Sequence, residues 1–251
     1  AEADEKVQRA LDMVRLGHFG NRRPGQLSGG QQQRVAVARA LVFDPELVLM
    51  DEPLGALDKN LREEMQFEIK HIHENLGVSV VYVTHDQSEA LTMSNRIAVF
   101  DDGIIQQLAE PDHLYEQPSN AFVAYFIGEN NRLRGTVSKM NGSSCTVQLD
   151  NDGGEVQALA VNVGGEGKPT TLSLRPERVT VNPQADQVPN AFEAEVEELI
   201  YLGDHIRTRV KVCGNNEFVI KIPNAQGHAV IRRGEKVRVG WAMEDCRALD
   251  A

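Results

Sequence analysis

An uninterrupted apolar run, residues 47–50, leads directly into two adjacent carboxylates, Asp51 and Glu52. Such a run is typical of a strand that is buried on both faces of a parallel sheet. Ligands of open α/β sheets bind beyond the carboxyl ends of the strands, where both acids would lie. One carboxylate could hold Mg²⁺ and the other could orient or deprotonate a water molecule. We expect such a role because a buried acidic pair without one would be costly.

Two glycines, Gly29 and Gly30, stand where apolar residues begin to recur with helical spacing. Ser28 and Gln31 have the spacing of a capping box, which predicts that a helix begins here. Free backbone N–H groups at the positive end of a helix, with no Cβ in the way, can bind phosphate oxygens. Taken alone, the capping pattern fits an ordinary helix start better than a ligand site.

A second apolar run, residues 78–83, follows a helical segment that Gly77 is expected to end. It predicts a second buried strand, parallel to the first and joined to it by a right-handed crossover. His85 comes just after this run, so it should reach the same sheet edge as Glu52. A lone histidine is usually structural, but this position favours a contact with a ligand.

Composition excludes several classes of protein. The net charge of −11 argues against a protein that binds a nucleic-acid backbone, which needs a basic face. Cys145, Cys213 and Cys246 are odd in number and lack Cys-x-x-Cys spacing, so we interpret them as reduced thiols. No apolar stretch approaches the roughly 20 residues of a membrane span. Any association with a membrane should therefore pass through a partner.

From about residue 129 the helical periodicity gives way to short β-type runs separated by Gly, Asn and Asp turns. This spacing predicts a small closed or Greek-key barrel. The runs cover residues 133–137, 146–149, 171–174, 192–197, 208–212, 218–222 and 236–239.

Four segments in the first half resemble the motifs of ABC-type ATPases, in the order of that family. Residues 27–31 resemble the signature motif, and residues 47–52 the Walker B strand. Residues 54–58 resemble the D-loop, and residues 84–86 the switch-histidine region. The resemblance implies an α/β P-loop NTPase-type partial domain over residues 1–128, and an all-β OB-like barrel over residues 129–251.

The resemblance also implies a homodimer in which ATP is held between two subunits. Asp51 would organise Mg²⁺, Glu52 would polarise water and His85 would hold the γ-phosphate. Asp58 would link the two sites across the interface. The residues expected to contact the γ-phosphate from the other subunit are Ser28, Gly29, Gly30 and Gln31.

The phosphate-binding loop of this family, Gly-x-x-x-x-Gly-Lys-Ser/Thr, has no match in the chain. The pair Gly167-Lys168 is followed by proline, and Asn162 stands where the first glycine should be, so we interpret it as a turn. We therefore expect about a hundred residues, the size of a small domain, to precede residue 1. The chain alone should bind ATP very weakly and be inactive.

Residues 172–177 and 201–204 resemble the transport-associated OB (TOBE) domain of one class of importer ATPases. Arg175 and Glu177 could form a regulatory contact or only a structural link or turn. Residues 129–131 and 201–205 look most like polyamine- and opine-type importers. Sugar, iron and sulfate importers share the ATPase motifs and remain open alternatives.

The implied partners are transmembrane permease subunits and, indirectly, an extracytoplasmic solute-binding protein, at the cytoplasmic face of a bacterial inner membrane. Two other classes are weighed against this one. A soluble ABC ATPase acting on DNA or ribosomes should carry coiled-coil or basic insertions, and neither is visible. A non-catalytic module would use the barrel for dimerisation or regulation.

Overall fold

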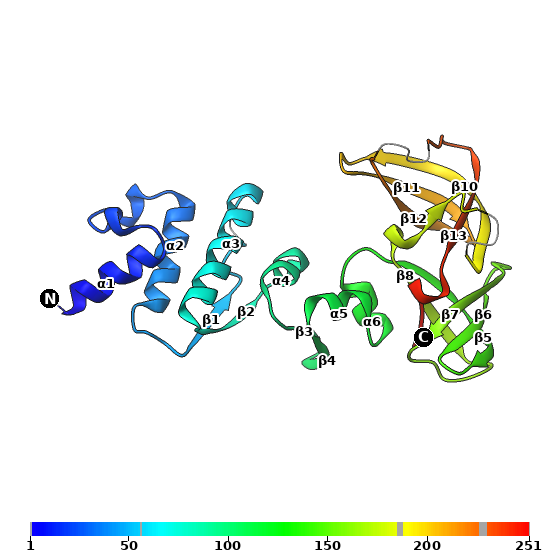
Figure 1. The fold of residues 1–251 in the computed structure, drawn as a ribbon, viewed down its shortest axis with the longest axis horizontal. Helices are drawn as coiled ribbons and strands as arrows, with labels where there is room; N and C mark the ends of the chain where they lie inside the picture. The colour runs from blue at the N-terminus through cyan, green and yellow to red at the C-terminus, as the bar shows by residue number, and fades with distance from the viewer. Residues whose placement is uncertain (1, 56, 185–187, 226–229, 251) are drawn as a thin grey trace. The chain divides into compact units, whose positions relative to one another are not determined.

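The computed structural model describes residues 2–55, 57–184, 188–225 and 230–250. The chain forms two compact units, residues 1–97 and 98–251, which we call the N-terminal and C-terminal units (Figure 1). The elements of the N-terminal unit are α1 (Glu2–Met13), η1 (Gly17–Phe19), η2 (Pro24–Gln26), α2 (Gly29–Leu41), β1 (Leu47–Asp51), α3 (Lys59–Leu76), β2 (Ser79–Val83) and α4 (Gln87–Met93).

The N-terminal unit has the parallel strand pair that the sequence predicts. Strands β1 and β2 pair in parallel, from Leu47 opposite Ser79 to Asp51 opposite Val83. Helix α3 connects them and ends at Gly77, whose φ of +62° is the left-handed conformation that glycine adopts at little cost. Both strands therefore deliver the residues that follow them to the same edge of the sheet.

The expected burial of this sheet on both faces is wrong. Val48 is 3% exposed in a cluster with residues of α1, α2 and α3, whereas Leu49, on the other face, is 72% exposed. Val81 and Val83 of β2 are also about half exposed. The reason is that the described residues put only two strands in this sheet and pack helices against one of its faces. Asp51 and Glu52 are exposed as well, so the expected cost of a buried acidic pair does not arise here.

A two-stranded hairpin and two short helices open the C-terminal unit. Strand β3 (Ile97–Asp101), which begins at the boundary between the units, pairs with β4 (Ile104–Ala109) across the Asp102-Gly103 turn. Helices α5 (Pro111–Glu116) and α6 (Ala121–Phe126) follow, and Gly128 comes next with φ of +70°.

The β-rich segment forms a barrel and a second sheet, where the sequence predicts one small barrel. The closed barrel has the strand order β14-β7-β6-β5-β8, and the sheet has the order β12-β11-β10-β13-β9. Each predicted run lies inside a strand, but β7, β9 and β14 have no predicted counterpart. The strands are β5 (Asn131–Asn141), β6 (Ser144–Leu149), β7 (Glu155–Ala160), β8 (Pro169–Leu174), β9 (Thr180–Val181), β10 (Asn190–Tyr201), β11 (His205–Val212), β12 (Asn215–Pro223), β13 (Lys236–Trp241) and β14 (Cys246–Leu249).

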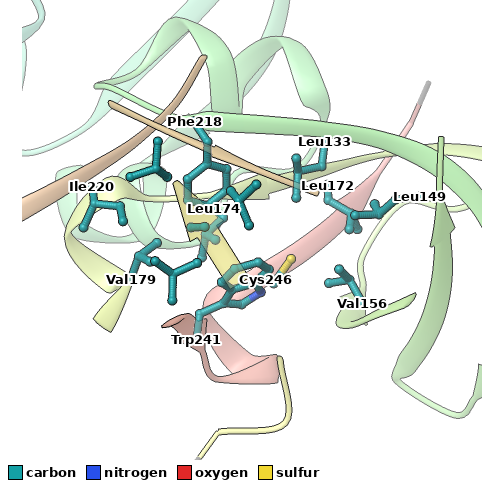
Figure 2. Packing of buried hydrophobic residues seen from close by; sticks show 14 of the residues in the cluster. Leu133, Leu149, Val156, Leu172, Leu174, Val179, Phe218, Ile220, Trp241 and Cys246 are labelled. Carbon is teal, nitrogen blue, oxygen red and sulfur yellow. The ribbon is translucent and has the colours of Figure 1, made fainter. Parts of the chain in front are cut away.

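The barrel and the second sheet share one apolar core. Leu133 and Leu172 of the barrel belong to the same buried cluster as Phe218 and Trp241 of the sheet (Figure 2). The Phe218 and Trp241 rings stack with their centroids 5.8 Å apart. Because one core holds both parts, this region should unfold as a unit. Two short 3-10 helices, labelled η, precede strands β9 and β14: η3 (Pro176–Arg178) and η4 (Met243–Asp245).

Candidate functional site

Glu52 and His85 meet at the carboxyl edge of the β1–β2 pair. The backbone N–H of Glu52 donates to the carbonyl of Val83 at 2.9 Å, which extends the strand pairing by one residue. The Glu52 Oε1 and His85 Nδ1 atoms lie 3.0 Å apart. Both side chains are open to solvent, with 51% of Glu52 and 76% of His85 exposed. The prediction that both residues reach the same edge of the sheet is confirmed.

The carboxylate of Glu52 sets the charge of the imidazole. A hydrogen bond to Glu52, and then the negative charge of the same group, raise the pKa of His85 above its ordinary value. The charges of Asp86 and Glu89 act in the same direction. The imidazole therefore stays protonated to a higher pH than a free histidine, and it can donate to an anion in that form.

Asp51 and Asp58 occupy the ends of the turn that follows β1. Asp51 is the last residue of the strand and is exposed. Asp58 caps α3, where its Oδ1 accepts from the backbone N–H of Leu61 at 3.1 Å. Ala56, in the middle of the predicted D-loop, lies outside the described residues. Leu54 anchors the turn because it is completely buried.

The predicted capping box at Ser28 is present. The Ser28 hydroxyl accepts from the N–H of Gln31 at 3.3 Å, and the Gln31 side chain accepts from the N–H of Ser28 at 3.0 Å. Gln32, which the sequence analysis did not single out, donates to the carbonyls of Pro24 and Leu27 at 3.1 Å each. The loop before α2 is therefore fixed by Ser28 and by side chains of the first turn of α2.

The two glycines differ in what surrounds them. A Cβ on Gly30 would lie 2.7 Å from a methyl carbon of Leu61 on α3, so this glycine lets α2 and α3 approach closely. A Cβ on Gly29 would meet nothing within 4 Å, and Gly29 is exposed. Packing within the described chain explains Gly30 but not Gly29. Gly29 thus leaves an open approach to the start of α2.

The structure does not bring all the predicted site residues together. Among the described residues, no hydrogen bond or ion pair joins residues 28–31 to Glu52 or His85. Glu52 and His85 form one group, and the start of α2 forms another.

A polar cluster behind His85 was missed by the sequence analysis. Glu89 of α4 is almost completely buried, and its carboxylate accepts from the hydroxyls of Tyr82 and Thr84, both at 2.8 Å. Burial and the bond to Glu89 raise the pKa of Tyr82, so the phenol remains a donor. Arg62 of α3 lies against the same cluster. The sequence feature that could have indicated this cluster is Glu89, which follows the Thr84-His85-Asp86 segment by about one helical turn.

Arg175 is buried, and its described hydrogen bonds go to backbone carbonyls. It donates to Tyr115, Ala124, Ile127 and Glu129 and stacks over the Tyr115 ring. It thereby satisfies carbonyls at the end of α6 that the helix leaves without partners. Glu177 accepts from the Tyr115 hydroxyl. These contacts favour the structural interpretation of Arg175 and Glu177, and the regulatory one remains a prediction.

The described parts of the chain contain neither a cluster of metal ligands nor a membrane-spanning helix. No group of three His, Cys, Asp or Glu side chains among these residues could hold a metal ion. Within the same ranges, no helix combines the length and the apolar composition needed to cross a membrane.

Two protein-family models match the chain. A model described as "ABC transporter" matches residues 2–55, which include the start of α2 and the β1 strand. A model described as "TOBE domain" matches residues 172–249, in the barrel and second sheet.

Curated relatives match almost the whole chain. The chain is 42% identical to the spermidine/putrescine import ATP-binding protein PotA of Trichodesmium erythraeum, over 99% of this chain and 66% of the relative. It is 43% identical to the protein of the same name from Rubrobacter xylanophilus, over 99% and 65%. It is 44% identical to PotA 2 of Pseudomonas aeruginosa, over 97% and 68%. The chain thus spans about two thirds of the length of these relatives.

Proposed function

The chain belongs to the family of ABC transporter ATP-binding proteins, and on that premise we propose that it is part of a subunit that hydrolyses ATP to power solute import. Residues 1–128 would belong to the nucleotide-binding domain, and residues 129–251 would form the TOBE domain. The proposal extends the activity named for the relatives to this chain.

The observation that carries the proposal is the 3.0 Å contact between Glu52 and His85 at one sheet edge. A carboxylate beside an imidazole can orient a water molecule and accept its proton. The protonated imidazole can donate to a phosphate oxygen, and the raised pKa of His85 favours that form. The pair therefore offers two of the groups that hydrolysis of a terminal phosphate uses, one for the attacking water and one for a phosphate oxygen.

The residues fit a nucleotide and Mg²⁺. Asp51 and Glu52 are exposed at a strand end, and Mg²⁺ binds through one or two carboxylates together with substrate phosphates. The metal would neutralise charge on the phosphates. Ser28 and Gly29 are exposed at the start of a helix of 13 residues, followed by the buried Gly30 and the half-buried Gln31, and a helix start of this kind favours anions.

The open approach to Gly29 supports a dimer, in which the start of α2 faces the nucleotide of the other subunit. Asp58 would then lie at the interface between subunits. We further propose permease subunits and, indirectly, an extracytoplasmic solute-binding protein as partners. The site of action would be the cytoplasmic face of a bacterial inner membrane.

Polyamines are the proposed cargo, because the relatives named above are spermidine/putrescine import proteins. The complete transporter should take up spermidine or putrescine, and these solutes should stimulate its ATP hydrolysis. Stimulation of ATP hydrolysis by a sugar, iron or sulfate instead would overturn the proposed cargo and leave the ATPase assignment intact.

The ATPase assignment is tested with Glu52→Gln in the complete protein. Glutamine keeps the shape of the side chain but cannot accept the proton from water, so the variant should bind ATP and remain a closed dimer. Size-exclusion chromatography with ATP should show the dimer, and phosphate release should fall by at least about a hundredfold. Normal turnover by this variant would contradict the assignment.

A further inference from the structure

We propose that Arg62 is a positioning residue that couples the turn ending at Asp58 to the turn that carries His85. The inference rests on the proposed function, because it assigns Arg62 a role in ATP hydrolysis. It concerns a side chain that touches neither the expected nucleotide nor the water.

One end of the guanidinium holds the turn after β1. The Nη2 of Arg62 donates to the carbonyl of Leu57 at 3.1 Å. Leu57 is the residue before Asp58, which caps α3. Because Arg62 stands on α3 itself, this bond fastens the turn to the first part of that helix.

The other end of the guanidinium holds the turn after β2. The Nη1 of Arg62 donates to Asp86 Oδ2 at 3.1 Å, and Asp86 directly follows His85. The other carboxylate oxygen of Asp86 caps α4 through the N–H groups of Ser88 and Glu89. A hydrogen bond from the Ser88 hydroxyl also lowers the pKa of Asp86, so this carboxylate is charged opposite Arg62. One planar guanidinium thus bridges two turns that are far apart in sequence.

The buried Glu89 makes the bridge specific for arginine. Glu89 Oε2 accepts from Tyr82 and Thr84, and the Thr84 hydroxyl in turn accepts from the N–H of Asp86 at 2.9 Å. Arg62 Nε lies 3.8 Å from Glu89 Oε1 and is a buried donor without a hydrogen bond. The guanidinium can therefore gain a bond to Glu89 when the turns move. Lysine, with one ammonium group, could not serve Leu57, Asp86 and Glu89 together.

In the proposed dimer, Asp58 responds to the other subunit and His85 responds to the nucleotide. Arg62 would make the two responses depend on each other, because neither turn can shift without straining the bonds of the other. A purely structural arginine would stabilise the unit without affecting the rate of hydrolysis by the folded protein. The two roles are separated by measuring turnover, stability and local opening on the same variants.

The variants are Arg62→Lys, which keeps the charge, and Asp86→Asn, which keeps the oxygen that caps α4 but breaks the contact with Arg62. The matched control is Arg15→Lys. Arg15 follows α1, and its guanidinium lies 3.0 Å from the carboxylate of Glu68, which is on α3 but away from both turns. ATP hydrolysis is measured in the complete transporter, and amide hydrogen exchange in the complete protein without nucleotide.

Arg62→Lys should lower kcat about tenfold while the KM for ATP changes less than about twofold. The double variant should be no slower than the slower single variant, because both substitutions break the same bridge. Amide exchange should accelerate in residues 57–58 and also in residues 84–86, whereas Arg15→Lys should change neither turnover nor exchange there.

Unchanged kcat in Arg62→Lys, multiplicative losses in the double variant, or faster exchange in only one of the two turns would each overturn the coupling. Exchange is measured without nucleotide, so it decides the coupling even if the wild-type transporter hydrolyses no ATP. Absence of wild-type hydrolysis would refute the proposed function instead.

Discussion

Gly30→Ala and Gly29→Ala form a matched pair that separates packing from ligand approach. The methyl group added at Gly30 would lie 2.7 and 2.9 Å from the two methyl carbons of Leu61 and 3.2 Å from its Cγ. The whole end of the Leu61 side chain would have to move, and overpacking of this kind costs about 1–3 kcal/mol. Alanine offsets part of this cost, because its helix propensity exceeds that of glycine by up to about 1 kcal/mol.

We therefore expect Gly30→Ala to lower the free energy of unfolding of the N-terminal unit by up to about 2 kcal/mol, because the end of the Leu61 side chain can give way in part. Gly29→Ala adds a methyl group that meets nothing, so it should leave stability unchanged or raise it by up to about 1 kcal/mol. In the complete protein, Gly29→Ala should nevertheless reduce ATP hydrolysis, because its methyl group obstructs the proposed approach of the nucleotide.

Urea unfolding can be followed separately for the two units. The long helices lie in the N-terminal unit, so far-UV circular dichroism reports mainly on that unit. The single tryptophan, Trp241, is buried in the C-terminal unit, so its fluorescence provides an internal control that neither substitution should change. Equal stabilisation by both alanines would refute the packing argument for Gly30.

Two further predictions concern single side chains. Because the pKa of His85 is raised, the stabilisation from its contact with Glu52 is present while the imidazole is protonated and is lost as the pH rises through that pKa. Replacing Glu52 with glutamine should therefore lower the pKa of His85, and an unchanged midpoint in an NMR titration would contradict the contact. Arg175→Lys should lower the free energy of unfolding of the C-terminal unit by about 3 kcal/mol, measured by Trp241 fluorescence, since carbonyls now bonded to the guanidinium would lose their partner. The exposed Arg178→Lys is the control, expected to cost less than about 1 kcal/mol, and equal losses would contradict the role of Arg175.

Local patterns in the sequence were sufficient for the β1–β2 pair, for the start of α2 and for the central pair of the site. The apolar runs before Glu52 and His85 specify two parallel strands, and parallel strands carry the residues that follow them to one edge. The capping box at Ser28 involves residues three apart, so its side-chain pairing could also be inferred. These features depend only on how side-chain direction repeats along a strand or helix, and on residue pairs within one helical turn.

Contacts between distant segments were decided only by the tertiary structure. The reason for a glycine at position 30 lies on another helix, at Leu61, and the partners of Arg62 lie on two different turns. The division of the β-rich segment into a barrel and a sheet depends on β14, which pairs with β7 and β8 from much earlier in the chain. Exposure of Leu49 also depends on how many strands and helices cover the sheet. Residue periodicity fixes which face of an element is apolar, but only the packing of other elements decides whether that face is covered.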